Sequence, residues 1–313
     1  MNVAAAISTD ETDRAARIAA LGYDYDAQPK QRHGACNLCG GAVFVTVSHR
    51  DRYGFAASAQ ACRACGLTFL NPVMTAEAYG AFYRDTYRPL VSAYHGRLID
   101  AATVQADQKP YAARLAEQIA ALRGGRRGGA LLDIGGSTGI VAHAVARRCG
   151  MEATVIDPAP MEVAVAERLG ISCITGLVED YDPGPQRFDL ILICQTIDHV
   201  LDLKGTIAKS RRLLNEGGLL FVDIVDFRAA FRRTGAVEAA IKIDHPYYLT
   251  EETMEACLTQ CGFAVLALDY APDHLHVGFF CRPDTPRPEA RRDADAVRGF
   301  FRELRAIQNR VPP

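Results

Sequence analysis

The sequence lacks any apolar run long enough to cross a membrane. A spanning helix needs roughly 20 consecutive apolar residues, and no stretch of the 313 residues approaches that length. The opening segment, MNVAAAISTDETDR, contains acidic residues early and lacks the cationic start and apolar core of a secretory signal. From these two absences we expect a cytoplasmic protein without a membrane span.

A strong net charge is also missing. The formal charge is −2 at pH 7, although several arginines gather near the C-terminus. A chain without a large basic excess lacks the electrostatic footprint of a nucleic-acid binder, so we do not expect a nucleic-acid partner. Hydrophobic residues make up 49% of the chain, which is enough for a substantial core.

Disulfides are not expected in a reducing compartment, so the ten cysteines need another explanation. Four of them follow the pattern C-x2-C-x22-C-x2-C, and a glycine comes after each pair. Two close pairs can converge as four thiolates around a tetrahedral Zn²⁺, and a closed site of this kind is structural, not catalytic. Because the gap is slightly longer than usual, iron or an unloaded site stays open as an alternative. The predicted ligands are Cys36, Cys39, Cys62 and Cys65.

Changes in composition divide the chain into five segments. We expect a flexible lead-in, a zinc-ribbon module, a helical cover segment, an α/β domain that carries a ligand site, and a C-terminal tail with a helix. In that order, the ranges are 1–32, 33–71, 72–128, 129–283 and 284–313.

The α/β domain is predicted from alternating strand and helix patterns after residue 129. Such alternation indicates a doubly wound, mostly parallel sheet of seven strands with helices on both faces. The last two predicted strands, 264–269 and 275–281, are joined by a connection too short for a crossover. They must therefore form an antiparallel hairpin at the sheet edge, an ending foreign to an ordinary dinucleotide-binding fold.

The segment LLDIGGSTG, residues 131–139, turns from a buried strand into a helix. Small residues there let the backbone approach a ligand at the carboxyl edge of the sheet. The glycine spacing of a dinucleotide fingerprint fails, and no Gly-Lys-Ser/Thr ending for phosphates is present. Asp133 at the strand end suits a ligand with an ammonium group and no phosphates, such as S-adenosylmethionine. Asp157 in VIDP, after the next strand, is placed to accept both ribose hydroxyls.

These residues resemble the class I S-adenosylmethionine-dependent methyltransferases, whose loop reads Asp/Glu-x-Gly-x-Gly-x-Gly. Ser137 replaces the middle glycine. The resemblance covers residues 130–281 and implies a Rossmann-like methyltransferase fold, a transferase activity and S-adenosylmethionine as cofactor. The implied cofactor-binding residues are Asp133, Gly135, Gly136, Gly139, Asp157, Pro158, Val178, Glu179 and Gln195.

The stretch from CNLCG through CRACGLTFLNP to AFYRDTY resembles the N-terminal part of bacterial methyltransferases associated with sugar and polysaccharide assembly. That resemblance implies O-methylation of a sugar or glycan-type small acceptor. It also implies that Tyr83 and Tyr87 close over the active site, unless they only pack a cover helix. A sugar hydroxyl needs a base, and histidine is the natural choice. We favour His245, which could instead cap or pack, and we expect His199 to have a structural role beside Asp198.

Three other functions remain open at this point. Related proteins with similar ribbons methylate carbon in nucleotide-linked keto-sugars, although they carry a further C-terminal domain for which this chain has too little sequence. Some ribosomal-RNA methyltransferases also carry a ribbon, but the ribbon segment here has few basic residues. The non-enzyme alternative is a scaffold that keeps a vestigial cofactor fold.

Overall fold

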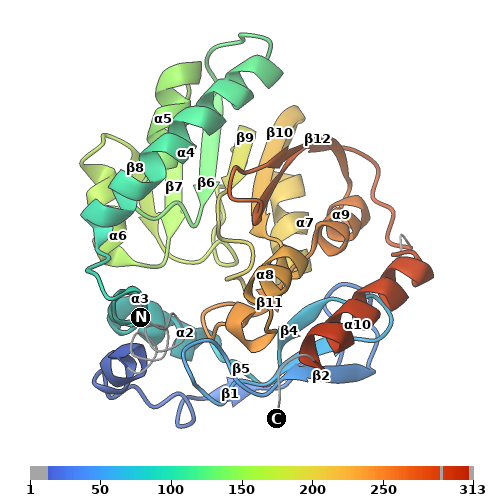
Figure 1. Cartoon of the computed structure of the whole chain (residues 1–313). Helices are drawn as coiled ribbons and strands as arrows, with labels where there is room; N and C mark the ends of the chain where they lie inside the picture. Colours follow the sequence, from blue (N-terminus) through green and yellow to red (C-terminus); the bar gives the residue numbers. More distant parts are fainter. Residues whose placement is uncertain (1–12, 290–291, 310–313) are drawn as a thin grey trace.

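A seven-stranded sheet forms the centre of the larger domain in the computed structural model, which describes residues 13–289 and 292–309 (Figure 1). The strand order is β12-β13-β10-β9-β6-β7-β8. Strand β13 runs antiparallel to both of its neighbours, and the other pairs are parallel. This arrangement confirms the predicted methyltransferase-type fold with its closing hairpin. The strands are β6 (Ala130–Ile134), β7 (Glu152–Asp157), β8 (Ser172–Thr175), β9 (Phe188–Ile193), β10 (Leu214–Val225), β12 (Phe263–Tyr270) and β13 (His276–Pro283).

Helices cover both faces of this sheet, because the central strands are apolar on both sides. In β6, Leu131 packs into the core under one helical layer and Leu132 into the core under the other. The first layer contains α4 (Ala101–Leu122) and α5 (Ile140–Cys149), and the second contains α7 (Leu203–Leu213) and α9 (Glu251–Gln260). Helix α6 (Pro160–Glu167) follows β7 near the sheet edge (Figure 1).

The carboxyl ends of β6, β7 and β9 point toward two short cover helices (Figure 1). These are α2 (Ala76–Asp85) and α3 (Tyr87–His95), which come from the predicted helical cover segment. Thr75 caps α2 by accepting a hydrogen bond from the amide of Ala78, and Phe82 on its inner face is 1% exposed. The cover helices therefore close the edge of the sheet at which an α/β fold binds its ligand.

The cysteine segment folds as a small antiparallel sheet of order β11-β4-β3-β2. Three strands come from the predicted ribbon: β2 (Phe44–Ser48), β3 (Ala59–Cys62) and β4 (Thr68–Leu70). The fourth, β11 (Tyr247–Tyr248), belongs to an excursion after β10 that also contains α8 (Phe227–Thr234) and the 3-10 turn η1 (Glu238–Ala240). The ribbon sheet thus extends beyond residues 33–71, because its edge strand is supplied by the larger domain.

Both flanking segments pack against the ribbon. Residues 1–12 of the expected flexible lead-in lie outside the described residues; in the rest of that segment Ile18 and Tyr25 are buried, and β1 (Lys30–Gln31) pairs with β5 (Val73–Met74). In the C-terminal segment, α10 (Ala294–Gln308) buries Phe300 and Leu304 in the same core. The apolar side chains of both segments explain this docking, which removes their surface from water.

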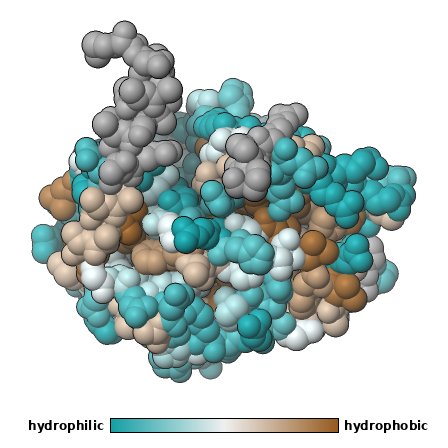
Figure 2. Space-filling view, turned by 60° about the horizontal axis from the view of Figure 1, so that its bottom comes forward, coloured by the Kyte–Doolittle hydropathy of each residue, from teal (hydrophilic) through white to brown (hydrophobic). Residues whose placement is uncertain are grey.

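No helix within the described ranges combines the length and the apolar character required to cross a membrane. The face turned forward in Figure 2 is mainly hydrophilic, and its hydrophobic residues are scattered in small patches.

Candidate functional site

The loop after β6 turns sharply into α5. Gly135 and Gly139 have φ of 67° and 71°. Glycine adopts this left-handed region without steric strain because it has no Cβ. A Cβ on Gly139 would lie 2.8 Å from the Cβ of Ala166, and one on Gly135 would overlap the side chain of Thr196. The loop is therefore packed on both sides, and only glycine fits at these two positions.

Asp157, at the end of β7, is hydrogen-bonded to the loop. Its carboxylate accepts hydrogen bonds from the amides of Ser137 at 2.8 Å and Ala159 at 2.9 Å. Burial raises the pKa of Asp157 to about 6, although these two amides partly oppose the rise. The side chain lines the cavity described below, so it can meet a ligand there.

Asp133 lies under the loop and does not line the cavity. It is fully buried, and neither carboxylate oxygen has a hydrogen-bond partner among the described residues. Burial, followed by the charge of Asp157, raises the pKa of Asp133 to about 8, so the group is mainly protonated at neutral pH. A Cβ on Gly136 would approach the Asp133 carboxylate to 2.8 Å. The Asp133 side chain therefore packs against the loop and does not contact the cavity.

A cavity of about 440 Å³ opens between the carboxyl edge of the sheet and the cover helices. On the loop side it is lined by six of the nine predicted cofactor residues: Gly135, Asp157, Pro158, Val178, Glu179 and Gln195. The other three, Asp133, Gly136 and Gly139, shape the loop without facing the cavity. The opposite wall is aromatic, with Tyr79, Tyr83 and Tyr87 from the cover helices, and His199 lies beside it.

The protonation of His199 follows from its neighbour Tyr83. Nδ1 of His199 lies 2.7 Å from the Tyr83 hydroxyl, which also donates to the backbone carbonyl of Asp244 at 2.9 Å. A phenol has one hydrogen, so Tyr83 accepts from Nδ1–H, and the lone pair of the neutral ring is on Nε2. Burial, followed by the charge of His245, lowers the pKa of His199 to about 4. The ring is therefore neutral at pH 7.

Nε2 of His199 faces no protein donor or acceptor at hydrogen-bonding distance in the described ranges. The carboxylate of Asp198 is 4.0 Å from it. The Asp198 group is ionised: burial raises its pKa, but His245 and then His199 outweigh burial and hold the pKa well below its usual range. His199 thus lines the cavity and carries an unprotonated Nε2 close to a buried negative charge.

His245 lies behind His199, with ring centroids 4.4 Å apart. Its Nδ1 is 2.8 Å from a carboxylate oxygen of Asp198, and its Nε2 is 3.3 Å from Nζ of Lys242. The side chain is 7% exposed and is not among the residues that line the cavity. Both ring nitrogens are therefore engaged by the protein, which leaves neither for an acceptor.

Asp198, His199 and His245 also place one potential metal-ligand atom each within 4.8 Å of one another. The ammonium group of Lys242 beside His245 opposes a second cation at that point. The trio is better described as a buried hydrogen-bonded network that fixes His199.

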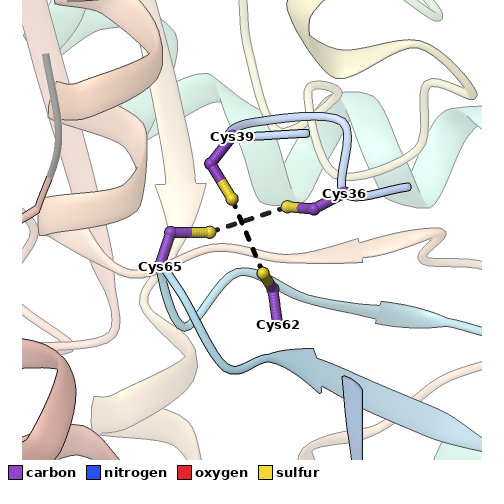
Figure 3. Close-up of side chains that lie close together, drawn as sticks. All are labelled: Cys36, Cys39, Cys62 and Cys65. Carbon is purple, nitrogen blue, oxygen red and sulfur yellow. Dashed lines mark hydrogen bonds between the residues drawn. The ribbon is translucent and has the colours of Figure 1, made fainter. Parts of the chain in front are cut away.

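The four predicted metal ligands converge in the ribbon, as Figure 3 shows. The Sγ atoms are 3.6 Å apart for Cys36 and Cys65 and 3.5 Å apart for Cys39 and Cys62. Zn–S bonds of about 2.3 Å in a tetrahedron require S–S distances of roughly 3.8 Å, close to those observed. In each knuckle the glycine amide donates 2.8 Å back to the carbonyl of the first cysteine, from Gly40 to Cys36 and from Gly66 to Cys62. The residues fit a structural zinc ion.

The sequence did not indicate the contacts that join the ribbon to this site. Asn37, inside the first cysteine pair, accepts from the amide of Lys204 at 2.8 Å and donates to Asp202 at 2.9 Å. These residues start α7, directly after the turn that carries His199. The Cys-Asn-x-Cys pattern gives no indication of a partner so distant in the chain.

The fold and the loop geometry define a class I S-adenosylmethionine-dependent methyltransferase. A sequence model of the methyltransferase-domain family matches residues 105–268, more than half of the chain. The chain therefore belongs to this family.

Curated relatives share only part of the domain. The ubiquinone biosynthesis O-methyltransferase of Methylocella silvestris is 34% identical over 97 residues, which cover 29% of this chain and 38% of the relative. The enzyme of the same name from Xylella fastidiosa is 32% identical over 108 residues, covering 32% and 43%. The chain thus spans less than half the length of these relatives.

Solved structures resemble the chain only loosely. An S-adenosylmethionine-dependent methyltransferase from Clostridium acetobutylicum aligns with a TM-score of 0.48 at 12% identity, covering 58% of this chain and 95% of that one. Magnesium protoporphyrin IX methyltransferase from Synechocystis, solved with bound S-adenosylmethionine, aligns with a TM-score of 0.45 at 12% identity, covering 59% and 82%.

Proposed function

We propose that this protein transfers the methyl group of S-adenosylmethionine to a hydroxyl group on a small ring-shaped acceptor, with His199 as the general base. The observation that carries the proposal is His199, which has an unprotonated Nε2 without a protein partner in the described residues and lines a cavity that also contacts the cofactor loop. A base must reach the proton that it removes, and the support for His199 is that it lines the cavity whereas His245 does not.

Each of these residues would have a separate role in the in-line displacement that transfers the methyl group. The loop at Gly135 and Asp157 would hold the cofactor, which supplies a methyl group activated by its sulfonium. Nε2 of His199 would take the hydroxyl proton as the new C–O bond forms and the C–S bond breaks, leaving the electron pair on sulfur. Asp198, ionised and 4.0 Å away, would stabilise the imidazolium. The cover helices would exclude water.

The aromatic wall of the cavity, formed by Tyr79, Tyr83 and Tyr87 and here called the acceptor wall, favours a flat phenol-type ring over a sugar as the acceptor. The hydroxyls of Tyr79 and Tyr83 already donate to backbone carbonyls, of Ile243 and Asp244 respectively, so the wall offers mainly ring faces. A sugar ring would need several free hydrogen-bonding groups. The name of the relatives, ubiquinone biosynthesis O-methyltransferase, supports an O-methyl acceptor. A sugar hydroxyl is the second candidate, favoured by the resemblance of the ribbon and Tyr-x3-Tyr segment to sugar-associated methyltransferases.

Binding of S-adenosylhomocysteine by calorimetry tests the cofactor assignment. We expect saturable binding by the parent protein and a loss of at least tenfold in affinity for Asp157→Ala, because that carboxylate positions the loop and faces the cavity. A parent protein that does not bind would refute the proposal.

A panel of catechols, simple phenols and nucleotide-linked sugars, assayed with labelled cofactor, separates the acceptor classes. We expect label in the phenols. Label in a sugar oxygen would favour the second candidate, and label in a sugar carbon or in RNA would overturn O-methylation of a small hydroxyl acceptor.

Two matched variants test the base. His199→Asn should lower kcat by about 10²-fold while S-adenosylhomocysteine still binds, and His245→Asn should cost less. The pH profile gives a second check. Because the pKa of His199 is lowered to about 4, the acidic limb should lie near pH 4 and not near 6.5. Equal losses in the two variants, or a limb near 6.5, would remove His199 from this role.

We also propose that the four cysteines hold a structural Zn²⁺. The Sγ–Sγ distances support this, and elemental analysis of the purified protein tests it. Iron in place of zinc, or no bound metal, would contradict the proposal.

A further inference from the structure

Ser137 has an unusual place in the cofactor loop. It stands where the family pattern has its middle glycine, and its backbone has φ of 48°. A non-glycine residue in the left-handed region is strained, and such strain persists only where the surroundings enforce it. The serine side chain must therefore contribute something that glycine would not.

That contribution is a chain of contacts leading out of the loop. The Ser137 hydroxyl donates to one carboxylate oxygen of Glu162 at 2.5 Å, and Nε of Arg88 donates to the other at 2.8 Å. The Glu162 side chain is only 9% exposed, and Arg88 is its ion-pair partner. Arg88 is the only lysine or arginine among the described residues that line the cavity.

The three residues come from three separate elements. Ser137 is in the cofactor loop, Glu162 is in the first turn of α6, and Arg88 is in α3, the cover helix that lies below α6 in Figure 1. The Arg88 guanidinium lies 5.2 Å from the ring centroid of Tyr87, which forms part of the acceptor wall. Tyr87 in turn packs edge-on against His199, with ring centroids 6.2 Å apart. The contacts therefore run from the cofactor loop to the residues around the acceptor.

We propose that Ser137, Glu162 and Arg88 form a latch that couples occupation of the cofactor loop to the position of cover helix α3. The latch rests on the proposed function, since it requires a cofactor at the loop. The amide of Ser137 donates a hydrogen bond to Asp157, so a ligand that fixes Asp157 also restrains the backbone of Ser137, from which the hydroxyl reaches Glu162. Glu162 and Arg88 pass that constraint to α3, and the aromatic wall is set before the acceptor arrives. These are positioning residues, because their effect acts through Tyr87.

The test measures amide hydrogen exchange in residues 87–95 with and without S-adenosylhomocysteine. In the parent protein the ligand should slow exchange in α3 by about tenfold, a typical coupling between sites. Ser137→Gly keeps the amide that donates to Asp157 but lacks the hydroxyl. With S-adenosylhomocysteine at saturating concentration, this variant should lose the slowing in α3.

Arg88→Met should also abolish the slowing, and Arg88→Lys, which keeps the charge, should restore part of it. Because the residues act in series, the double variant Ser137→Gly with Arg88→Met should lose no more than either single variant. With an active acceptor, Ser137→Gly should raise the acceptor KM by about tenfold and change kcat much less.

The outcomes separate the latch from the proposed function. A parent protein that fails to bind S-adenosylhomocysteine would defeat the proposed function itself. Normal binding with slowed exchange in α3 that survives Ser137→Gly would overturn only the latch. Loss of the slowing in Ser137→Gly, which disturbs packing least, supports the latch even if Arg88→Met folds poorly.

Discussion

Replacing Asp133 by asparagine tests the protonation of the buried acid under the cofactor loop. The parent carboxyl is fully buried with no hydrogen-bond partner in the described structure, and its pKa is raised to about 8. Between an unfolded pKa near 4 and this folded value, the folded protein holds a proton that the unfolded chain has lost. The contribution of Asp133 to the free energy of unfolding is therefore largest below about pH 4 and decreases as the pH rises to 8.

The size of the effect follows from the linkage relation. Each pH unit in this window costs about 1.36 kcal/mol, so the parent should lose on the order of 4 kcal/mol between pH 5 and pH 8 from Asp133 alone. Asparagine resembles the protonated acid in shape and does not titrate. The free energy of unfolding of Asp133→Asn minus that of the parent should therefore increase by about the same amount between pH 5 and pH 8.

The assay is urea unfolding followed by circular dichroism at pH 5, 6, 7 and 8, on parent and variant. Asp180→Asn is the matched control, because Asp180 is exposed and its substitution should leave the pH dependence unchanged. Parallel stability curves for the parent and Asp133→Asn would refute the reasoning, since they would mean that Asp133 is ionised in the folded protein.

Three further substitutions probe other parts of the site. Tyr83→Phe removes the donor to a buried carbonyl and should lower the free energy of unfolding by about 1–3 kcal/mol in urea; an unchanged midpoint would contradict the hydrogen bond. Gly135→Ala places a Cβ against Thr196 at positive φ, so calorimetry should detect no S-adenosylhomocysteine binding, and parental affinity would show that the loop can yield. Cys65→Ser should lower both zinc content and thermal midpoint; full zinc retention would argue against its role as a ligand.

Local patterns were sufficient to predict most of the sheet. The closing strands predicted at 264–269 and 275–281 correspond to β12 and β13, and the loop from Asp133 to Gly139 turns into a helix as expected, because residue periodicity and turn chemistry depend on neighbouring residues. The cysteine cluster was equally predictable, because metal ligands of one type at fixed spacing have few other uses.

What the sequence did not predict depends on contacts between distant segments. Strand β11 has only two residues, too few for any periodic pattern, and it exists because β4 offers it an edge. From the sequence we favoured His245 over His199 as the base, although both follow strand ends. Only the packing shows that one ring reaches the cavity while the other is enclosed by Asp198 and Lys242.

The shared edge between β11 and β4 limits how this chain can vary. Pro246, next to His245, accepts a hydrogen bond from Leu70 at 2.9 Å, and Tyr247 pairs with Phe69 in the ribbon. If the ribbon were replaced by one from another protein, its edge strand β4 would still have to pair with β11, which lies nearly two hundred residues later in the chain. We therefore expect substitutions at Phe69 and Tyr247 to occur in compensating pairs.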